Sequence, residues 1–386
     1  MTELKFAEPL NLPEELGMMR DQIRRFVETE VVPNGDAWEE AGKIPREVFH
    51  KLGDMGMLGM RHPVKYGGTD LGPVASVIFA EELGRSTYGG VPASVVVHTD
   101  MSATHISRRG TDAQKAKYLP GAIAGKMIAA IAVTEPGAGS DVARLKTRAV
   151  RDGDQYVING SKIYITNGIY ADFYIVAART DPDAKGSRGI SLFLVDKGTP
   201  GLVIGKKLRK HGDLCSDTAE LFFEDLRVPA DSLLGDLHKG FYAIMDNFQN
   251  ERMVMAGFSI GASMRALEIT LEHARSREVF DGTLWDLQAT RQKLAMLATK
   301  VSAARALNFH CAYMEDQGMD CIAEISQTKV LACEVHVEVV NACLQLHGGM
   351  GYMHGTTIER MVRDARLQTI GGGATEVMLE EIAKRM

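Results

Sequence analysis

Two stretches of small residues give the first sign of chemistry in this sequence. Residues 369–377 read TIGGGATEV, with three consecutive glycines at 371–373. Glycine permits backbone conformations and close approaches that a Cβ forbids, so this run predicts either a helix stop or a ligand lying against the main chain. Residues 132–141, AVTEPGAGSD, combine glycines with the hydroxyls of Thr134 and Ser140. Such a loop can present N–H and O–H groups to a polar ring or a phosphate.

The strongest candidate for proton transfer is Glu251, in the stretch NFQNERMVMAG at 247–257. A single glutamate most often lies on a solvated helix face. Here Met255, Phe258 and Ala262 follow at helical spacing, so the same face carries an apolar stripe that would desolvate the carboxylate. Desolvation raises the pKa of a carboxyl group and makes it a better base near neutral pH. The spacing therefore makes Glu251 a candidate general base, with an exposed helix position as the alternative.

A third glycine-rich stretch, QLHGGMGYM at 345–353, could be read as a dinucleotide-binding loop. The spacing G-x-G-x-x-G is not completed, because His354 stands where the last glycine is required. The stretch also continues a helical pattern, whereas the dinucleotide fold requires a preceding strand. We therefore reject a nucleotide-binding doubly wound fold.

The composition is that of an ordinary globular protein with a large core. The chain has 386 residues, of which 45% are hydrophobic and 24% charged, with a formal net charge of −6 and a pI near 6.0. This length predicts two or three domains. The acidic balance disfavours binding to nucleic acid or to anionic membranes. No apolar run approaches the length of a membrane span, so we expect none.

Cysteine usage and the N-terminal residues bear on the compartment. The five cysteines are odd in number, widely spaced and without a CxxC pair: Cys215, Cys311, Cys321, Cys333 and Cys343. They predict buried, reduced thiols, and we expect no metal site. The N-terminal sequence MTELKFAEPLNLPEEL has neither the apolar centre of a signal peptide nor the Arg-rich character of a transit peptide. We expect a cytoplasmic protein.

The spacing of apolar residues changes twice along the chain. It is helical from about residue 13 to 125, and again from about 239 to the end. From about 128 to 235, β-branched and aromatic runs predict strands. QYVINGSKIYIT is predicted to be a hairpin around Asn159 and Gly160. FYIVAA and ISLFLV predict further strands, and AELFFEDLRVP predicts an edge strand ending at Pro229.

This order of elements predicts an α+β fold, because strands and helices do not alternate. We expect an N-terminal α-helical domain at 1–127, a middle β-domain at 128–236 and a C-terminal helical bundle at 237–386.

The stretch at 132–141 is very similar to the signature of the acyl-CoA dehydrogenases. Further motifs resemble the same family in the same order along nearly the whole chain: KIYITNG, CSDTAELFFEDLRVP, SREVF followed by Gln288, and QLHGGMGYM. The resemblance implies that family's fold, the cofactor FAD, and oxidation of an acyl-CoA thioester to its trans-2-enoyl form. It also implies FAD contacts from Ile131, Val133, Thr134, Gly139, Ser140, Tyr164, Ile165, Thr166, Arg277, Phe280, Gln288, Gln345, Gly348, Gly349, Gly373, Thr375 and Glu376.

Three positions depart from the family pattern. Tyr164 stands where many members have tryptophan, Gly355 where an acidic residue is usual, and Ala374 where threonine is usual. The first departure replaces one aromatic ring by another at the flavin. The last two put a loop anchor and one hydroxyl contact to FAD in doubt.

The position of the base also departs from many members, which carry a glutamate where Gly372 stands. Isovaleryl-CoA and long-chain acyl-CoA dehydrogenases place it on an earlier helix, and Glu251 matches that position. The resemblance implies that the Gly372 N–H and a ribityl hydroxyl of FAD hold the substrate carbonyl. It places Ser140 at the CoA moiety and Arg252 at the phosphopantetheine or the base, with a plain ion pair of Arg252 as the alternative.

The resemblance also suggests partners and a substrate class. It implies an electron-transferring flavoprotein as acceptor and a homotetramer in which Arg277, Gln288 and the loop at 345–353 reach a neighbour's FAD. The relocated base and the glycines at 371 and 372 favour a medium or long, or 3-methyl-branched, acyl chain of the citronellyl-CoA kind. Two alternatives are a flavin oxidase or monooxygenase of the same fold, and a non-catalytic carrier of acyl-CoA or flavin.

Overall fold

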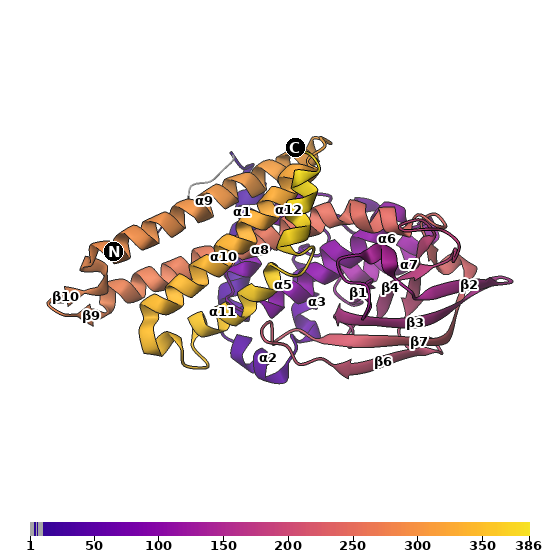
Figure 1. Ribbon diagram of the computed structural model, residues 1–386, viewed down its shortest axis with the longest axis horizontal. Coiled ribbons are helices and arrows are strands. Elements are labelled where there is room, and N and C mark those ends of the chain that lie inside the picture. Colours follow the sequence, from indigo (N-terminus) through magenta and orange to yellow (C-terminus); the bar gives the residue numbers. More distant parts are fainter. Residues whose placement is uncertain (1–3, 5, 7–10) are drawn as a thin grey trace.

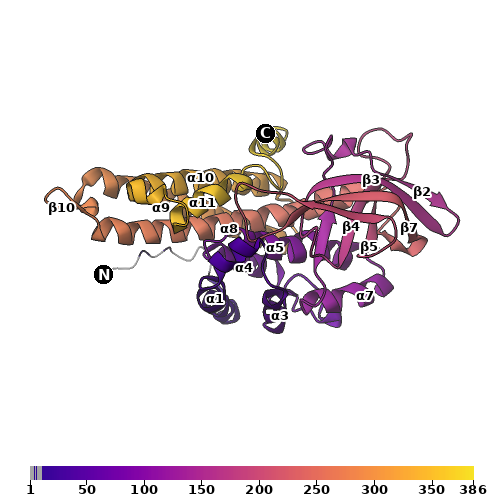
Figure 2. The ribbon, with the colours of Figure 1, turned by 90° about the horizontal axis from the view of Figure 1, so that it is seen from below.

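The chain forms a helical layer, a β-sheet and a bundle of long helices, in that order. The computed structural model describes residues 4 and 6 and residues 11–386; residues 1–3, 5 and 7–10, which belong to the N-terminal stretch used above to predict the compartment, lie outside the described residues. The sheet occupies one end of the elongated molecule and the long helices extend to the other (Figures 1 and 2). The predicted α+β class is confirmed.

The N-terminal part is made of short helices joined by tight turns. Two of them are π-helices and one is a 3-10 helix. In order they are α1 (Glu14–Phe26), η1 (Val27–Val31), α2 (Gly35–Ala41), α3 (Arg46–Asp54), η2 (Val64–Tyr66), α4 (Gly72–Gly84), α5 (Gly90–Val96), η3 (Val97–Ala103), α6 (Thr104–Arg109) and α7 (Asp112–Ile123).

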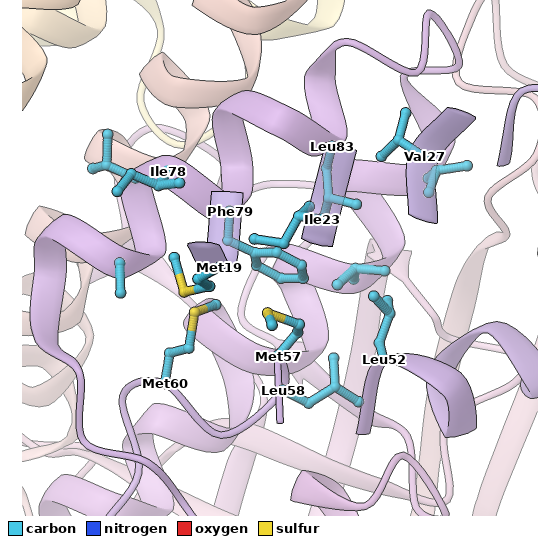
Figure 3. Close-up of a cluster of buried hydrophobic side chains, with 14 of the residues drawn as sticks. Met19, Ile23, Val27, Leu52, Met57, Leu58, Met60, Ile78, Phe79 and Leu83 are labelled. Atoms are coloured by element: carbon cyan, nitrogen blue, oxygen red, sulfur yellow. The ribbon is translucent and has the colours of Figure 1, made fainter. Parts of the chain in front are cut away.

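The helical spacing read from the sequence builds the first core cluster. Met19, Ile23 and Val27 lie on one face of α1 and η1 and are buried. They meet Leu52 of α3 and Phe79 of α4 in a continuous apolar cluster (Figure 3). Each such side chain contributes roughly 1.5–3 kcal/mol to the free energy of unfolding when fully buried. This cluster therefore holds α4 against α1.

The middle part contains one mixed sheet. Its strands are β1 (Ala129–Ala132), β2 (Arg148–Asp152), β3 (Gln155–Thr166), β4 (Phe173–Arg179), β5 (Ile190–Asp196), β6 (Leu202–Lys207), β7 (Thr218–Pro229) and β8 (Leu233–Leu234), with short helices η4 (Val142–Arg144) and η5 (Ala230–Ser232). The strand order is β6-β7-β3-β2-β4-β5-β8, and β1 pairs with β4 in parallel. The strands predicted from FYIVAA and ISLFLV are confirmed as β4 and β5.

The hairpin predicted around Asn159 and Gly160 is wrong. Both residues lie inside the continuous strand β3, at a bulge opposite β7. Gly160 is required there because a Cβ would lie 2.5 Å from the Thr147 hydroxyl, and the Asn159 amide binds the Asp225 side chain and backbone across the strands. The chain reverses instead at Gly153, whose φ is +63°.

The edge position predicted for AELFFEDLRVP is also wrong, although the strand does end at Pro229. β7 lies between β3 and β6, and β6 forms the edge. The half-polar sequence LVIGKK of β6 gave no strand signal, so the additional partner of β7 was missed.

The C-terminal part is dominated by three long helices. It contains α8 (Gly240–Ser276), the hairpin β9 (Glu278–Val279) and β10 (Gly282–Thr283), η6 (Leu284–Asp286), α9 (Gln288–Asp316), α10 (Ile322–Gly351), α11 (Thr357–Gln368) and α12 (Thr375–Ala383). Of the described helices, α8 alone is long and apolar enough to cross a membrane by length and composition, and 72% of its most apolar window is buried inside the protein. This burial is that of a core helix.

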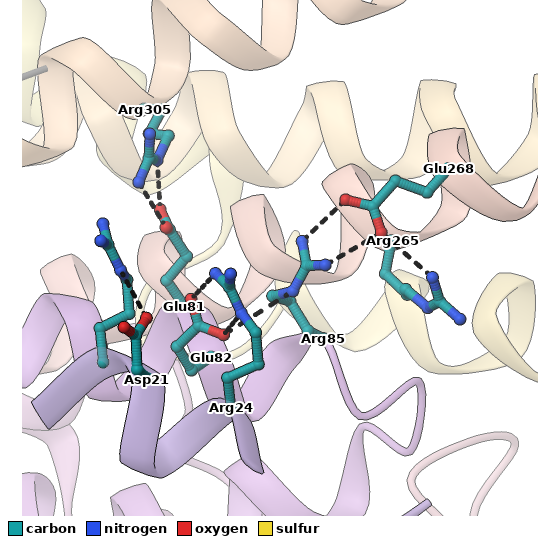
Figure 4. A network of polar contacts seen from close by, with 9 residues as sticks. Asp21, Arg24, Glu81, Glu82, Arg85, Arg265, Glu268 and Arg305 are labelled. Atoms are coloured by element: carbon teal, nitrogen blue, oxygen red, sulfur yellow. Dashed lines mark hydrogen bonds and ion pairs between the residues drawn. The ribbon is translucent and has the colours of Figure 1, made fainter. Parts of the chain in front are cut away.

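Ion pairs from two buried glutamates join α4 to α9 and α1 (Figure 4). Arg305 of α9 contacts both carboxylate oxygens of Glu81 at 2.8 Å. Arg24 of α1 binds Glu82 in the same two-pronged way, at 2.6 and 3.0 Å. Close approach of α4 and α8 depends on Gly261, where a Cβ would lie 1.8 Å from the Glu81 carbonyl oxygen. The N-terminal layer is therefore held rigidly against α8.

Candidate active site

The loop at 132–141 follows directly from β1 and is held by hydrogen bonds from the buried side chain of Lys162 on β3. Lys162 donates to Glu135 Oε1 at 2.8 Å and to the Val133 carbonyl at 2.9 Å. Glu135 also accepts the backbone N–H groups of Lys146 and Thr147. Burial raises the pKa of Glu135, but Lys162 and these hydrogen bonds outweigh it and the net pKa is lowered. The ionised pair holds the loop in one conformation while Gly139 and Ser140 stay exposed.

An aromatic surface lies next to this loop on β3. Ile163 N–H donates to the Thr134 carbonyl at 3.0 Å, which joins the loop to the strand. A second irregularity in the β3–β7 pairing puts Tyr164 in the left-handed region, with φ +61° and 67% of the residue exposed. Ile165 is buried and Thr166 half-buried beside it. An exposed ring held in a costly backbone conformation, beside an open glycine loop, fits a flat ligand such as a flavin ring.

The three glycines form the connection between α11 and α12, facing α8. Gly372 (φ +62°) and Gly373 (φ +106°) are left-handed, and a Cβ at Gly372 would lie 2.3 Å from Met255 Sδ. Arg252 Nε donates to the Gly372 carbonyl at 3.5 Å. Within the described residues no acceptor is found for the Gly372 N–H, whereas the Gly371 N–H is bonded to Leu367. The glycines therefore permit close contact with α8 and leave one amide free for a ligand.

Glu251 lies on α8 one turn before Met255, so it is adjacent to the glycine connection. The glutamate is 5% exposed, and Met255 and Phe258 of the predicted apolar stripe are buried with it; Ala262 is half-buried. Burial raises the pKa of Glu251 to about 8, while a hydrogen bond from Asn247 and the charge of Arg252 act in the opposite direction. The burial expected for this carboxyl group is confirmed.

Arg252 is buried and makes no ion pair within 4 Å among the described residues. Its guanidinium lies over the Phe248 ring, 5.6 Å from the centroid, and against the Gly372 carbonyl. Burial lowers the pKa of Arg252. The plain ion pair considered from the sequence is therefore not formed, and Arg252 contacts the glycine connection.

Sequence reasoning missed the polar groups behind Glu251. The Asn247 side chain donates to Glu251 Oε1 at 2.9 Å and to the Asp100 carbonyl at 3.0 Å. Asp100 itself is 3% exposed. The sequence did indicate that Asp100 is unusual, since an aspartate inside the apolar helical run VVVHTDMSATHI costs free energy to bury and is retained only where it has polar partners or a function.

The remaining residues expected at FAD fall into two groups. Thr375 and Glu376 begin α12 beside the glycine connection, and the Thr375 hydroxyl is bonded to Glu334 at 2.7 Å. The second group lies at the far end of α8, in the β9–β10 hairpin and the end of α10, and all its members are exposed: Arg277, Phe280, Gln288, Gln345, Gly348 and Gly349. Stacking of His273 on His347, with centroids 4.1 Å apart, holds the two segments together.

Arg277 and its neighbours cannot reach the site around Glu251 within a single chain. Glu251 and Arg277 are separated by twenty-six residues of nearly continuous helix, or about 39 Å. The β9–β10 hairpin accordingly lies at the end of the bundle opposite the sheet (Figure 1). Of the site residues expected from the sequence, one set lies on the glycine connection beside α8 and on the loop at 132–141, where Val133 and Phe248 of α8 pack against the same apolar cluster. The other set lies at the opposite end of the bundle (Figure 1). No group of three or more His, Cys, Asp or Glu side chains that could hold a metal occurs among the described residues.

Comparison with known proteins identifies the class. Residues 13–126, 130–226 and 238–386 match the N-terminal, middle and C-terminal domains of acyl-CoA dehydrogenase. The chain belongs to the acyl-CoA dehydrogenase family.

Individual relatives span nearly the whole chain. The long-chain specific acyl-CoA dehydrogenase of Rattus norvegicus is 40% identical over 373 residues, 96% of this chain and 86% of that protein. The isovaleryl-CoA dehydrogenase of Pongo abelii is 37% identical over 369 residues, 95% and 87% of the two chains. A glutaryl-CoA dehydrogenase from Mycobacterium smegmatis, solved in complex with FADH2, is 31% identical with a TM-score of 0.91 and covers 97% of this chain and 95% of its own.

The protein is therefore an acyl-CoA dehydrogenase, an oxidoreductase that acts on a CH–CH bond of an acyl-CoA with FAD as cofactor. The residues present fit that cofactor. The exposed Tyr164 ring and the open backbone of Gly139 can receive the flavin ring. The Gly372 N–H, which has no acceptor among the described residues, belongs to the connection that approaches Met255, one helical turn from Glu251.

Proposed function

We propose that Glu251 is the base that removes the α-proton of the acyl-CoA, and that the Gly372 N–H polarises the thioester carbonyl. A Cα proton of a thioester is weakly acidic, so its removal requires both a base and fixed donors for the charge that develops on the carbonyl oxygen. The observation that carries this assignment is a buried carboxyl group with a raised pKa one helical turn from the residue that touches Gly372.

In this reaction the Cα–H bond breaks and a new O–H bond forms on Glu251. When bound, FAD supplies the acceptor for the hydride that leaves Cβ. Arg252 holds the Gly372 carbonyl and so fixes the peptide that follows the proposed N–H donor. Met255 and Phe258 exclude water from the carboxylate and keep its proton affinity high. We propose that Ser140 contacts the CoA moiety; its exposure on the loop at 132–141 supports this.

We propose a medium-length or long acyl chain, or one branched at C3 as in citronellyl-CoA. Two observations support this choice. Gly371 and Gly372 leave no side chain beside the space in front of Glu251, and Met255, the side chain nearest to them, is flexible and can repack around a branch. The match to long-chain and isovaleryl-CoA dehydrogenases points the same way.

We propose a homotetramer, because the far-end group around Arg277 can complete an FAD site only on another copy of the chain. An electron-transferring flavoprotein is the proposed electron acceptor. We further propose that 1–127, 128–236 and 237–386 are the three domains and that the protein is cytoplasmic. The five cysteines support a reducing compartment, since all are free and buried.

One anaerobic experiment tests the function. Acyl-CoA is added to the flavin-loaded protein and the flavin absorbance is followed, with butyryl-, octanoyl-, palmitoyl-, isovaleryl- and citronellyl-CoA. Bleaching followed by slow reoxidation in air is the expected result for a dehydrogenase. Fast reoxidation by air would indicate an oxidase or monooxygenase, and no bleaching with any substrate would indicate a carrier. Highest kcat/KM on butyryl-CoA would contradict the proposed substrate class.

A further inference from the structure

The helix segment η3 directs backbone carbonyl groups at the helix that carries Glu251. η3 is a π-helix, whose wider turn is rare and is often found at functional sites. The Asp100 carbonyl oxygen accepts hydrogen bonds from the side chains of Asn247 at 3.0 Å and Asn250 at 3.1 Å. Asn247 uses its other N–H on Glu251 Oε1 at 2.9 Å. One amide therefore joins Asp100 to the proposed base.

The side chain of Asp100 is a second carboxyl group in this buried cluster. Asn250 donates to its Oδ1 at 3.3 Å, and its Oδ2 lies 2.5 Å from the Thr99 hydroxyl. That hydroxyl also lies 3.1 Å from the Val95 carbonyl. A hydroxyl has one proton, and a carbonyl can only accept. Both contacts are satisfied together when Thr99 donates to Val95 and Asp100 Oδ2 carries a proton that it donates to Thr99.

We propose that Asp100 is a positioning residue for the base. As a protonated, neutral acid its side chain holds Asn250, the residue before Glu251 on α8, while its backbone carbonyl holds Asn247, which binds Glu251. The two carboxyl groups then carry at most one negative charge between them. This inference rests on the proposed role of Glu251. Asn247 engages Oε1, and within the described residues Oε2 has no donor, so Oε2 is the oxygen left to take the α-proton.

The charges around the pair agree with this assignment. Burial raises the pKa of Asp100, and Arg61, on the loop after α3, opposes the shift without forming an ion pair with it. Arg61 is instead bonded to Glu315 at 2.6 Å. The charge of Arg252, on α8, lowers the pKa of Glu251, and that of Asp100, on η3, raises it.

The neighbouring imidazoles do not supply a charge. Burial lowers the pKa of His98 to about 4 and that of His105 to about 3, so both are neutral at neutral pH. β1, which also packs against η3, brings only alanines and one isoleucine. The second proton therefore has no competing titratable partner on these elements.

Two buried carboxyl groups in one cluster titrate as a pair, because ionising one makes ionisation of the other costlier. In the reactive form of the site Glu251 is ionised and Asp100 is protonated, and because the pKa of Glu251 is raised to about 8, this form becomes more populated as the pH rises. After proton transfer both are protonated, and the cluster is neutral. Asp100 thus confines the negative charge to the group that faces the substrate.

Infrared spectroscopy of the flavin-loaded protein tests the protonation directly. The difference spectrum between wild type and Asp100→Asn at pH 7 is expected to contain the C=O stretch of a carboxylic acid. In the Glu251→Gln background the band is expected to disappear at lower pH than in wild type, because the neighbouring charge that retains the proton is gone. A carboxylate band alone at pH 7, or a band with the same pH dependence in both backgrounds, would overturn the inference.

Kinetics test the positioning. Asp100→Leu removes the side-chain contacts to Asn250 and Thr99 and leaves the backbone bond to Asn247. It is expected to slow flavin reduction by octanoyl-CoA on the order of tenfold, with unchanged acyl-CoA affinity, and Asp100→Asn is expected to recover most of that loss. Asp246→Asn, which changes an exposed aspartate of α8, is the control. If Glu251→Gln keeps full activity, the proposed function fails; if Glu251→Gln is inactive but Asp100→Leu reduces flavin like wild type, only the positioning inference fails.

Discussion

Among the buried carboxyl groups of the described residues, those of α4 and that of Glu251 on α8 have opposite surroundings. On α4, Glu81 forms a bidentate pair with Arg305, and Glu82 forms one with Arg24 (Figure 4). On α8, Glu251 is equally buried, yet no cation lies within 4 Å of its oxygens among the described residues, and one amide is its hydrogen-bond donor.

The difference separates a structural charge from a reactive one. A buried carboxylate with a bidentate arginine keeps its charge, and its removal leaves the arginine buried and unpaired. A buried carboxyl group without a cation gains affinity for a proton. The protein thus contains a scaffold in which charges are fixed and a site in which one charge is free to be neutralised.

The largest expected effect is on the rate of proton transfer. Glu251→Gln removes the base and is expected to lower the rate of flavin reduction by acyl-CoA on the order of 10² to 10⁴-fold, while FAD and acyl-CoA still bind. Anaerobic stopped-flow measurement of flavin bleaching gives the rate. Glu272→Gln, at an exposed site on the same helix, serves as the control and should reduce flavin like wild type. Wild-type turnover by Glu251→Gln would remove the distinction between the two sets of carboxylates.

The complementary change on α4 should affect stability and leave the chemistry intact. Glu81→Gln leaves the Arg305 guanidinium buried without its carboxylate partner, and losing one member of a buried pair costs about 3–5 kcal/mol. We expect a lower urea midpoint and an unchanged rate of flavin reduction per flavin-loaded site. A large loss of rate with normal stability would mean that α4 also takes part in the reaction.

A third test uses pH. Because the folded-state pKa of Glu251 is raised from 4.5 to about 8, its contribution to stability is fully present below about pH 4.5 and is lost as the pH rises through about 8. The free energy of unfolding of wild type relative to Glu251→Gln should therefore fall by a few kcal/mol across this window. Urea titrations of both proteins at the two ends of the window measure it. The rate of flavin reduction should rise over the same range, and a relative stability that increases with pH would contradict the raised pKa.

The smallest expected effect comes from moving the base to the glycine connection. Glu251→Gly with Gly372→Glu should recover a small part of the lost rate, because a Cβ at residue 372 meets Met255 and its left-handed backbone costs about 1–2 kcal/mol for a residue with a side chain. Adding Met255→Ala should increase the recovery. Flavin reduction by octanoyl-CoA compares the double and triple variants, and no gain in a folded, flavin-loaded triple variant would mean that Met255 is not the obstacle.

The spacing of apolar residues was sufficient to predict an element where the apolar positions of the sequence are also the buried positions of the structure. The stripe formed by Glu251, Met255 and Phe258 was readable because all three lie on one face of a helix, and the structure buries all three. The strands β4 and β5 were readable because they are apolar throughout.

The errors arose where tertiary contacts override local preference. Asn159 and Gly160 have the residue types of a hairpin turn, but their partners across the sheet, Thr147 and Asp225, make the same pair a bulge. The exposure of β7 could not be judged without its second neighbour, β6. Asp100 was missed because the sequence indicates only that burying an aspartate in an apolar helix costs free energy. It does not indicate which residue binds there, since Asn247 is 147 residues away in sequence.

The length of α8 has a consequence for how this chain tolerates insertions. One added residue between Glu251 and Arg277 would turn everything beyond it by about 100° around the helix axis and advance it by about 1.5 Å. The stacked imidazoles of His273 and His347 would be separated, and the distal hairpin would point in a new direction while the site around Glu251 stayed in place. Length changes should therefore accumulate in the turn after Asp316, where the backbone is exposed, and be absent from the interior of this rod.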